Sequence, residues 1–185
     1  SGLDIDPYNQ LILNNIAKSL SSIGKLTESV IYYKKLLKIN PNFFQAHNNY
    51  GNTLEKLGLY EEAIIHYKKC LEIEPDYFMA HNNLGVIFSL TGEIDKSIKS
   101  YENVIKINPD YAPTYWNMHG CCKDINDAIS LLRKCVGLDS NYKKAYLTLA
   151  FLEAYLGNTD KYIEISRSSL KNDPYMRSFE WIFSL

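Results

Sequence analysis

The chain has 185 residues, of which 46% are hydrophobic and 22% are charged, an ordinary composition for a globular protein. Its 20 Lys and Arg residues nearly balance its 21 Asp and Glu residues, and the formal net charge is −1. That balance gives no electrostatic footprint for a nucleic acid or an acidic membrane, so we predict neither as a partner.

The chain also carries no sign of export or of membrane insertion. No apolar run approaches the roughly 20 residues that span a bilayer, and the start has no charged-then-apolar signal sequence. Four cysteines in a chain of this length do not form a disulfide framework. We therefore predict a reducing, cytoplasmic location.

The sequence repeats itself with a period of 34 residues. The block 41–74 aligns without a gap with the block 75–108, and both contain Ala-His-Asn-Asn followed by Tyr-Gly or Leu-Gly. A further block, 7–40, precedes them in the same register. We number the positions within each repeat so that Gly51 and Gly85 stand at position 8. A fixed period in the range of about 20–50 residues indicates a stacked repeat architecture.

Each repeat is predicted to hold two helices. Prolines end the preceding helix because they lack an amide donor and restrict the residue before them; they are Pro7, Pro41, Pro75 and Pro109. The residues predicted to cap the first helices are Asn42, Asp76, Asp110 and Asn141. Glycines that can adopt the left-handed conformation end the first helices; they are Gly24, Gly58, Gly92 and Gly157. The second helices are predicted to begin at about Leu26, Tyr60, Ile94 and Thr159.

The fourth repeat, 109–139, is shorter than the others, because Pro109 and Ser140 are only 31 residues apart. The missing residues lie between His119 and Asp127, which predicts a first helix about one turn short. The fifth repeat, 140–173, is regular again.

The segment 174–185 is predicted to form a C-terminal helix that is apolar around most of its circumference. A terminal cap normally has a polar outer face, so two interpretations stay open. The helix either caps the fifth repeat, with a homodimer through its apolar surface as a further option, or continues into a further domain.

The recurring residues resemble the tetratricopeptide repeat, a helix–turn–helix unit of 34 residues. The residues that carry this resemblance in the second repeat are His47, Tyr50, Gly51, Leu54, Ala63, Tyr67, Cys70 and Pro75. The resemblance implies an all-α fold, a right-handed α-solenoid of about five repeats plus a C-terminal helix, in a single domain over 1–185. It also implies that positions 2, 5, 6, 9, 12 and 13 of the first helices line a concave groove.

Asparagine recurs on one stripe of these first helices. Position 6 is Asn15, Asn49, Asn83 and Asn117, and position 5 adds Asn14, Asn48 and Asn82. Asparagine has only moderate helix propensity, but its amide offers both donors and an acceptor to a peptide backbone. Adjacent helices lie roughly 8–10 Å apart and three extended residues span about 10 Å. The stripe therefore predicts a site for an extended polypeptide; the alternative is that it bridges neighbouring helices and binds nothing.

The character of the implied groove changes along the chain. Lys18 and Asn52 make its first half polar, whereas Trp116 and Phe151 belong to an apolar later half. Contiguous exposed apolar surface usually marks a binding site, so we include Trp116 and Phe151 in the predicted site, together with Lys18 and Asn52 of the polar half. The alternative is that Trp116 and Phe151, with Leu147, pack against the short helix of the fourth repeat or against the final helix.

The asparagine column also resembles the superhelical repeats of the O-linked N-acetylglucosamine transferases, which implies that it holds substrate polypeptides. We predict a scaffold for protein–protein interaction whose partner is a protein or peptide. The alternative is the substrate-recruiting arm of a larger transferase whose catalytic domain lies outside this chain.

No catalytic residue, cofactor or metal site is predicted in this segment. The sequence has no phosphate-binding loop, nucleophile elbow or His-Glu-x-x-His motif. His47 and His81 both stand at position 4, a packing position between the two helices of a repeat, so we predict that they pack rather than bind metal.

Overall fold

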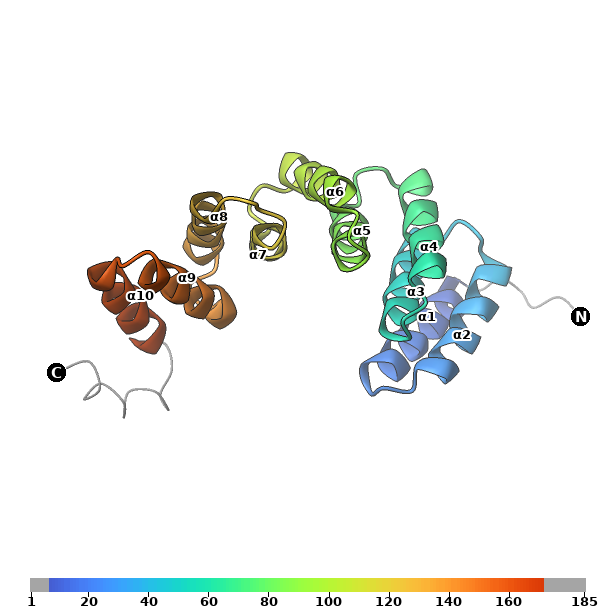
Figure 1. Cartoon of the computed structure of the whole chain (residues 1–185). Helices are drawn as coiled ribbons and strands as arrows, with labels where there is room; N and C mark the ends of the chain where they lie inside the picture. Colours follow the sequence, from blue (N-terminus) through green and yellow to red (C-terminus); the bar gives the residue numbers. More distant parts are fainter. Residues whose placement is uncertain (1–6, 172–185) are drawn as a thin grey trace, which may run out of the picture. The chain divides into compact units, whose positions relative to one another are not determined.

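The computed structural model describes residues 7–171, and the descriptions below concern that range. This range contains ten α-helices and no strands, and the helices follow one another in pairs (Figure 1). The helices are α1 Pro7–Ser22, α2 Leu26–Ile39, α3 Phe44–Lys56, α4 Tyr60–Ile73, α5 Phe78–Leu90, α6 Ile94–Ile107, α7 Ala112–His119, α8 Ile125–Leu138, α9 Lys143–Tyr155 and α10 Thr159–Lys171. This confirms the predicted all-α class. The predicted C-terminal helix 174–185, and with it the homodimer, lies outside the described residues.

The contacts divide the chain into two compact units, Ser1–Lys96 and Ser97–Leu185, and each is described by itself. The first unit contains α1 to α5 and the start of α6. The second contains the rest of α6 and the helices α7 to α10. The prediction of one continuous domain stays a prediction.

Four glycines end first helices as predicted. Their φ angles are 82° at Gly24, 77° at Gly58, 80° at Gly92 and 77° at Gly157, in the left-handed region that favours glycine. After Gly58, the amide of Leu59 returns to the carbonyl of Leu54 at 2.9 Å, which satisfies a terminal carbonyl of α3.

The first helix of the fourth repeat ends differently. Helix α7 spans 8 residues, whereas α3, α5 and α9 each span 13, so the predicted shortening is confirmed. Its C-cap Gly120 keeps right-handed backbone angles, with φ −68°. The next helix, α8, starts at a capping side chain that the sequence interpretation missed: Asp124 Oδ1 accepts from the amides of Asn126 at 2.7 Å and Asp127 at 3.3 Å.

The predicted caps of the first helices were wrong by one residue. The observed N-caps are Phe43, Tyr77, Tyr111 and Tyr142, and none of their side chains makes a capping hydrogen bond. A turn after each second helix takes up the residues in between. In the first such turn, Asn40 accepts the amide of Phe43 on its carbonyl at 3.3 Å and the amide of Asn42 on its side chain at 3.1 Å.

The core of the first unit is built around tyrosines at position 24 of the second helices. Tyr33 and Tyr67 are buried, together with Leu36 and Leu54. Tyr67 lies so close to the backbone of α3 that a Cβ on Gly51 would stand 2.5 Å from its Cε1 atom. The glycine at position 8 is therefore required by the close approach of the two helices.

The core of the second unit contains Leu132 and Leu149, with one buried acidic residue beside them. Glu153 is 1% exposed; it accepts hydrogen bonds from Arg133 of α8 and, at 2.7 Å, from Asn158. Burial raises the pKa of this carboxyl, but the bonds from Asn158 and Arg133 outweigh burial and the pKa is lowered overall. The acidic residue at this apolar repeat position is thus stabilised as a paired charge.

Candidate functional site

In the first unit, the first helices α1, α3 and α5 contact one another in succession, and asparagine side chains join them. Asn49 Nδ2 donates to Asn14 Oδ1 at 3.3 Å, which links α3 to α1. Asn83 Nδ2 donates to Asn48 Oδ1 at 3.1 Å and to Asn52 Oδ1 at 2.8 Å, which links α5 to α3. We call these five residues the asparagine ladder.

Burial explains why the ladder is hydrogen-bonded. Asn14 and Asn48 are 9% and 3% exposed, and Asn82 at the same repeat position is 7% exposed. A buried amide costs free energy unless its polar atoms find partners. Position 5 of one helix supplies the acceptor and position 6 of the next supplies the donor, so Asn49 and Asn83 each bridge two neighbouring first helices.

A buried tyrosine orients the last amide of the ladder. The hydroxyl of Tyr67 lies 2.7 Å from Asn52 Oδ1 and 2.9 Å from Glu55 Oε2, to which it donates. Burial raises the pKa of Tyr67, so the hydroxyl stays protonated and remains a donor. Since Asn52 Oδ1 faces both Tyr67 and Asn83, its Nδ2 is held on the opposite side.

The ladder leaves polar atoms open at its edge. Asn83 and Asn52 are half-buried, and within residues 7–171 neither Asn83 Oδ1 nor Asn52 Nδ2 makes a hydrogen bond. Asn15 and Lys18 of α1 are exposed. The arrangement therefore presents an oriented acceptor on α5 and an oriented donor on α3, with further exposed polar side chains on α1.

The other predicted site residues belong to the second unit. Asn117 is half-buried. Trp116 is also half-buried, and its ring is tilted against Tyr142, with 5.7 Å between ring centroids, and against His119, with 4.7 Å. Part of the Trp116 ring is therefore in contact with other rings of the second unit. Phe151 is 66% exposed and contributes no such packing in the part of the chain that the structure describes.

The sequence interpretation missed Tyr67 as a member of this polar network, because position 24 was treated only as a core aromatic. A signal was present in the sequence. Position 24 is tyrosine rather than phenylalanine in the first three repeats, at Tyr33, Tyr67 and Tyr101. A tyrosine that recurs in a core needs a partner for its hydroxyl.

Both histidines at position 4 make hydrogen bonds within the protein, and His81 Nε2 lies 3.0 Å from the carbonyl of Pro75. His47 Nδ1 lies 2.9 Å from His66 Nδ1 of α4, and His47 Nε2 lies 2.9 Å from the carbonyl of Pro41. Burial, with smaller contributions from His47 and Lys34, lowers the pKa of His66 to about 4. The described residues contain no group of three or more His, Cys, Asp or Glu side chains placed to hold a metal ion.

None of the helices from α1 to α10 is both long enough and apolar enough to cross a membrane.

Comparison with known proteins agrees with the helix pairing. Family models described as tetratricopeptide repeat match residues 12–43, 32–65 and 78–111, and a model described as TPR repeat matches residues 51–92. No curated protein sequence matches the chain.

Solved structures of repeat proteins share the fold. A crystal structure of MamA is 21% identical, with a TM-score of 0.73, over 95% of this chain and 97% of that one. TTC0263 from Thermus thermophilus is 18% identical, with a TM-score of 0.73, over 95% and 97% of the two chains. YrrB, described as a TPR protein with an unusual peptide-binding site, is 18% identical, with a TM-score of 0.63, over 94% and 91%.

At these identities the likeness to solved structures shows the fold alone, a helical repeat solenoid as predicted. The repeat models that match between residues 12 and 111, together with the helix pairs and their left-handed glycine turns, show that this chain belongs to the tetratricopeptide repeat family.

Proposed function

We propose that this protein-interaction scaffold binds an extended polypeptide segment along α1, α3 and α5 of its first unit. The contacts come from Asn15, Lys18, Asn52 and Asn83. Asn48 accepts a hydrogen bond from Asn83, and Asn14 accepts one from Asn49, while Asn82 is buried at the same repeat position as Asn14 and Asn48.

One observation carries the proposal, the paired open atoms Asn83 Oδ1 and Asn52 Nδ2. An extended chain carries a row of unpaired N–H and C=O groups along its edge. The acceptor on α5 takes an N–H and the donor on α3 takes a C=O, whatever side chains the polypeptide carries. Because Tyr67 and the ladder already fix both amides, binding orders few further side chains.

In the second unit, taken by itself, we propose Asn117 as a contact for a polypeptide, because it stands at position 6 of α7 like Asn49 and Asn83 in their helices. Trp116 stands beside it at position 5 of α7 and is half-buried. Neither residue is needed for the test below, which concerns the first unit.

The test removes open atoms without breaking the ladder. Asn52→Asp keeps Oδ1 as the acceptor for Tyr67 and Asn83 but replaces the outward donor, and Asn15→Ala removes an exposed amide. Peptides are first selected with the unsubstituted protein from a random library. We expect the double variant to bind them about tenfold to thirtyfold more weakly, from two lost hydrogen bonds of about 1 kcal/mol each.

The matched control is Asn42→Ala with Asn126→Asp, which makes the same changes at exposed positions away from the ladder. Thermal melts must show all three proteins equally folded. N-methylation of alternate peptide amides should abolish binding, whereas exchange of the peptide's side chains should not. Equal affinities of the double variant and the control, or indifference to N-methylation, would show the proposal to be wrong.

A further inference from the structure

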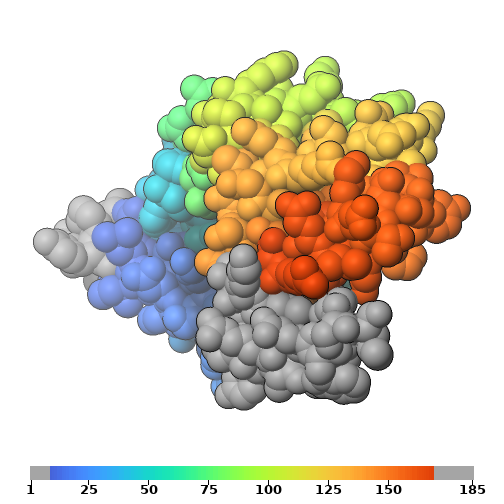
Figure 2. Space-filling model, turned by 90° about the vertical axis from the view of Figure 1, so that its left-hand side faces the viewer, coloured from blue at the N-terminus to red at the C-terminus, as the bar shows by residue number. Residues whose placement is uncertain are grey.

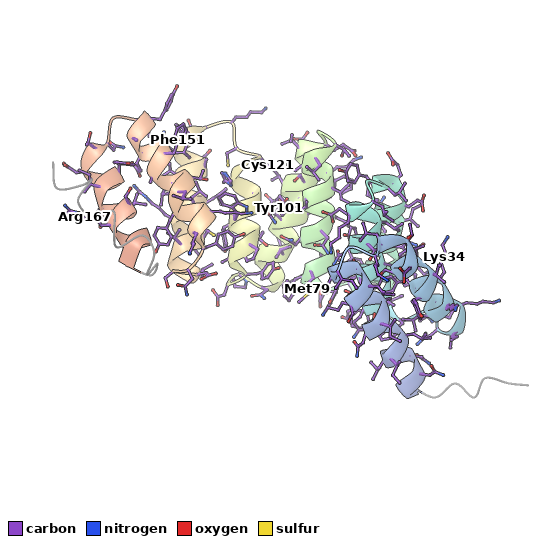
Figure 3. The ribbon with its side chains drawn as sticks, turned by 90° about the horizontal axis from the view of Figure 1, so that it is seen from below. Lys34, Met79, Tyr101, Cys121, Phe151 and Arg167 are labelled. Atoms are coloured by element: carbon purple, nitrogen blue, oxygen red, sulfur yellow. The ribbon has the colours of Figure 1, made fainter. Side chains whose placement is uncertain are left out.

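Two hollows lie among the helices α8, α9 and α10 of the second unit. Their volumes are about 430 Å³ and about 230 Å³, and both are lined by Arg133 of α8 and Lys161 of α10. In Figure 3 the label of Phe151 marks α9 and that of Arg167 marks α10, and in Figure 2 the three helices are coloured from yellow-orange to red. Because the two cations line both hollows, they stand where the hollows meet.

The smaller hollow has an excess of positive charge. Its one acidic residue, Glu153, accepts hydrogen bonds from Arg133 on Oε1 and, at 2.7 Å, from Asn158 on Oε2, so both carboxylate oxygens already have a partner. Lys161 is close enough to help lower the pKa of Glu153, but among the described residues it makes no ion pair. Arg133 uses one of its five N–H donors on Glu153. The ammonium group and further guanidinium donors therefore remain for an anion.

The larger hollow is mainly apolar beyond the two cations. The side chains of Val136, Tyr146, Leu149 and Ile165 line it. Glu164 also lines this hollow, although it is exposed to solvent, and it is absent from the lining of the smaller one. The pair of hollows therefore suits a ligand that is anionic at one end and apolar at the other.

The second repeat shows how the same place can be filled. Its positions 4, 7 and 23 are His47, Tyr50 and His66, and the His66 ring contacts the other two, with 5.2 Å and 4.3 Å between ring centroids. In the fifth repeat, aliphatic side chains replace two of these rings, Leu149 at position 7 and Ile165 at position 23. Rings thus occupy in the first unit the positions that line a hollow in the second.

A glycine in α8 also lines the larger hollow. Gly137 destabilises its helix relative to alanine, and packing does not require it, because a Cβ there would meet nothing within 4 Å. The same repeat position holds long charged side chains in the first three repeats, at Lys38, Glu72 and Lys106. The absence of a side chain at Gly137 keeps this side of the hollow open.

The buried carboxylate is the other departure from the repeat pattern. Position 11 is Leu54 and Phe88 in the second and third repeats, whereas in the fifth it is Glu153, which is 1% exposed. A carboxylate is unfavourable in such a place unless it is paired. Its bond to Arg133 holds the guanidinium group at the junction of the two hollows.

We propose that these hollows bind a small organic acid, in which a carboxylate or phosphate group is joined to an apolar body. The oxyanion takes the open donors of Arg133 and Lys161, since a planar guanidinium group fits either oxyanion. The apolar body enters the larger hollow beside Leu149 and Ile165. A volume of about 430 Å³ lies in the range of small-molecule sites, about 300–1,000 Å³. The proposal does not depend on the polypeptide site in the first unit.

Calorimetric titration of the full chain tests the proposal with phenylacetate and phenyl phosphate. Inorganic phosphate supplies the anion alone and benzyl alcohol supplies the apolar body alone. We expect at least one of the two acids to bind at least tenfold more tightly than either of these partial probes. In an NMR titration, the same acid should shift the backbone amide signals of Gly137 and Lys161. Absence of binding by both acids, or equally tight binding of inorganic phosphate, would overturn the proposal.

Two substitutions address the two ends of the ligand separately. Lys161→Gln removes an exposed cation and should weaken binding of the acid about tenfold, as expected for one hydrogen bond to a charged group. Gly137→Leu places a side chain in the larger hollow and should weaken it at least as much. Lys106→Gln, at an exposed lysine of α6 outside both hollows, is the matched control and should change nothing. Thermal melts verify that the variants fold, and unchanged affinity in Lys161→Gln, or equal weakening in the control, would contradict the site.

Discussion

The hydroxyl of Tyr67 is a single donor that connects the core of the first unit to its candidate site. The Tyr67 ring, on α4, is buried against Gly51 of α3, and its hydroxyl reaches the side chains of Asn52 and Glu55 on α3. Both the packing of α3 on α4 and the orientation of the ladder's edge therefore depend on this residue.

We expect Tyr67→Phe to lower the free energy of unfolding by about 1 kcal/mol, because the half-buried acceptors Asn52 and Glu55 lose their donor. Burial raises the pKa of Glu55, while the bond from Tyr67 and the charge of Lys56 lower it. Removal of the hydroxyl should therefore raise that pKa further. Urea unfolding and an NMR titration of the Glu55 carboxyl measure the two effects. Tyr155→Phe, at a side chain that is 75% exposed, is the control and should change neither.

Two glycines in helices predict opposite results for the same substitution. At Gly51 a Cβ would meet the ring of Tyr67 at 2.5 Å, whereas at Gly137 in α8 it would meet nothing within 4 Å. We expect Gly51→Ala to destabilise the protein by about 1–3 kcal/mol through overpacking. Gly137→Ala should stabilise it by about 0.5–1 kcal/mol through helix propensity. Thermal and urea unfolding of both variants check the signs, and equal effects would contradict the close approach of α3 and α4.

At the scale of elements, the contact of α3 with α4 contains a pair of histidines that depends on pH. With the proton of neutral His47 on Nε2, this atom donates to the carbonyl of Pro41. His47 Nδ1 is then unprotonated and accepts a hydrogen bond from His66 Nδ1. Burial lowers the pKa of both imidazoles, to about 4 for His66. Protonation of His47 Nδ1 removes the lone pair that accepts the hydrogen bond between the rings.

The folded protein therefore binds these protons more weakly than the unfolded chain, whose histidines titrate near pH 6.5. Stability from the pair is complete above that pH and is lost as the pH falls toward about 4. We expect a loss of about 1–2 kcal/mol after allowance for solvent screening. His66→Ser introduces the residue type found at this position in the third repeat, Ser100, and should flatten the dependence between pH 6.5 and 5. Urea unfolding across that interval measures it, and parallel curves for the two proteins would contradict the assignment.

At the scale of the whole molecule, repeat proteins derive their stability from individual repeats and from contacts between neighbours. The two units defined by the contacts should therefore respond separately to local destabilisation. We expect Gly51→Ala to accelerate amide exchange in α1 to α5 more than in α8 to α10. Arg133→Ala should do the reverse, because it leaves the buried Glu153 without its cationic partner, at a cost of about 1–3 kcal/mol. Equal acceleration throughout by either variant would show that the chain unfolds as a single unit.

The sequence by itself determined the class of fold, the helix pairs and the short α7. Periodic prolines and glycines act through local backbone restriction, which needs no knowledge of distant contacts, and the glycines have the predicted positive φ angles. Caps were less predictable: Asn42 and Asp110 are good capping residue types, but the turn before each first helix uses them differently.

Only the tertiary structure decided which polar atoms of the asparagine stripe make hydrogen bonds within the protein and which do not. Sequence placed seven asparagines at two repeat positions without distinguishing the buried Asn48 from the exposed Asn15. The distinction arises because hydrogen bonds between asparagine side chains join residues that are 35 positions apart and lie on different helices. In addition, Tyr67 of α4 orients the side chain of Asn52 on α3. Such bonds depend on how neighbouring helices pack, and no local pattern in the chain specifies that packing.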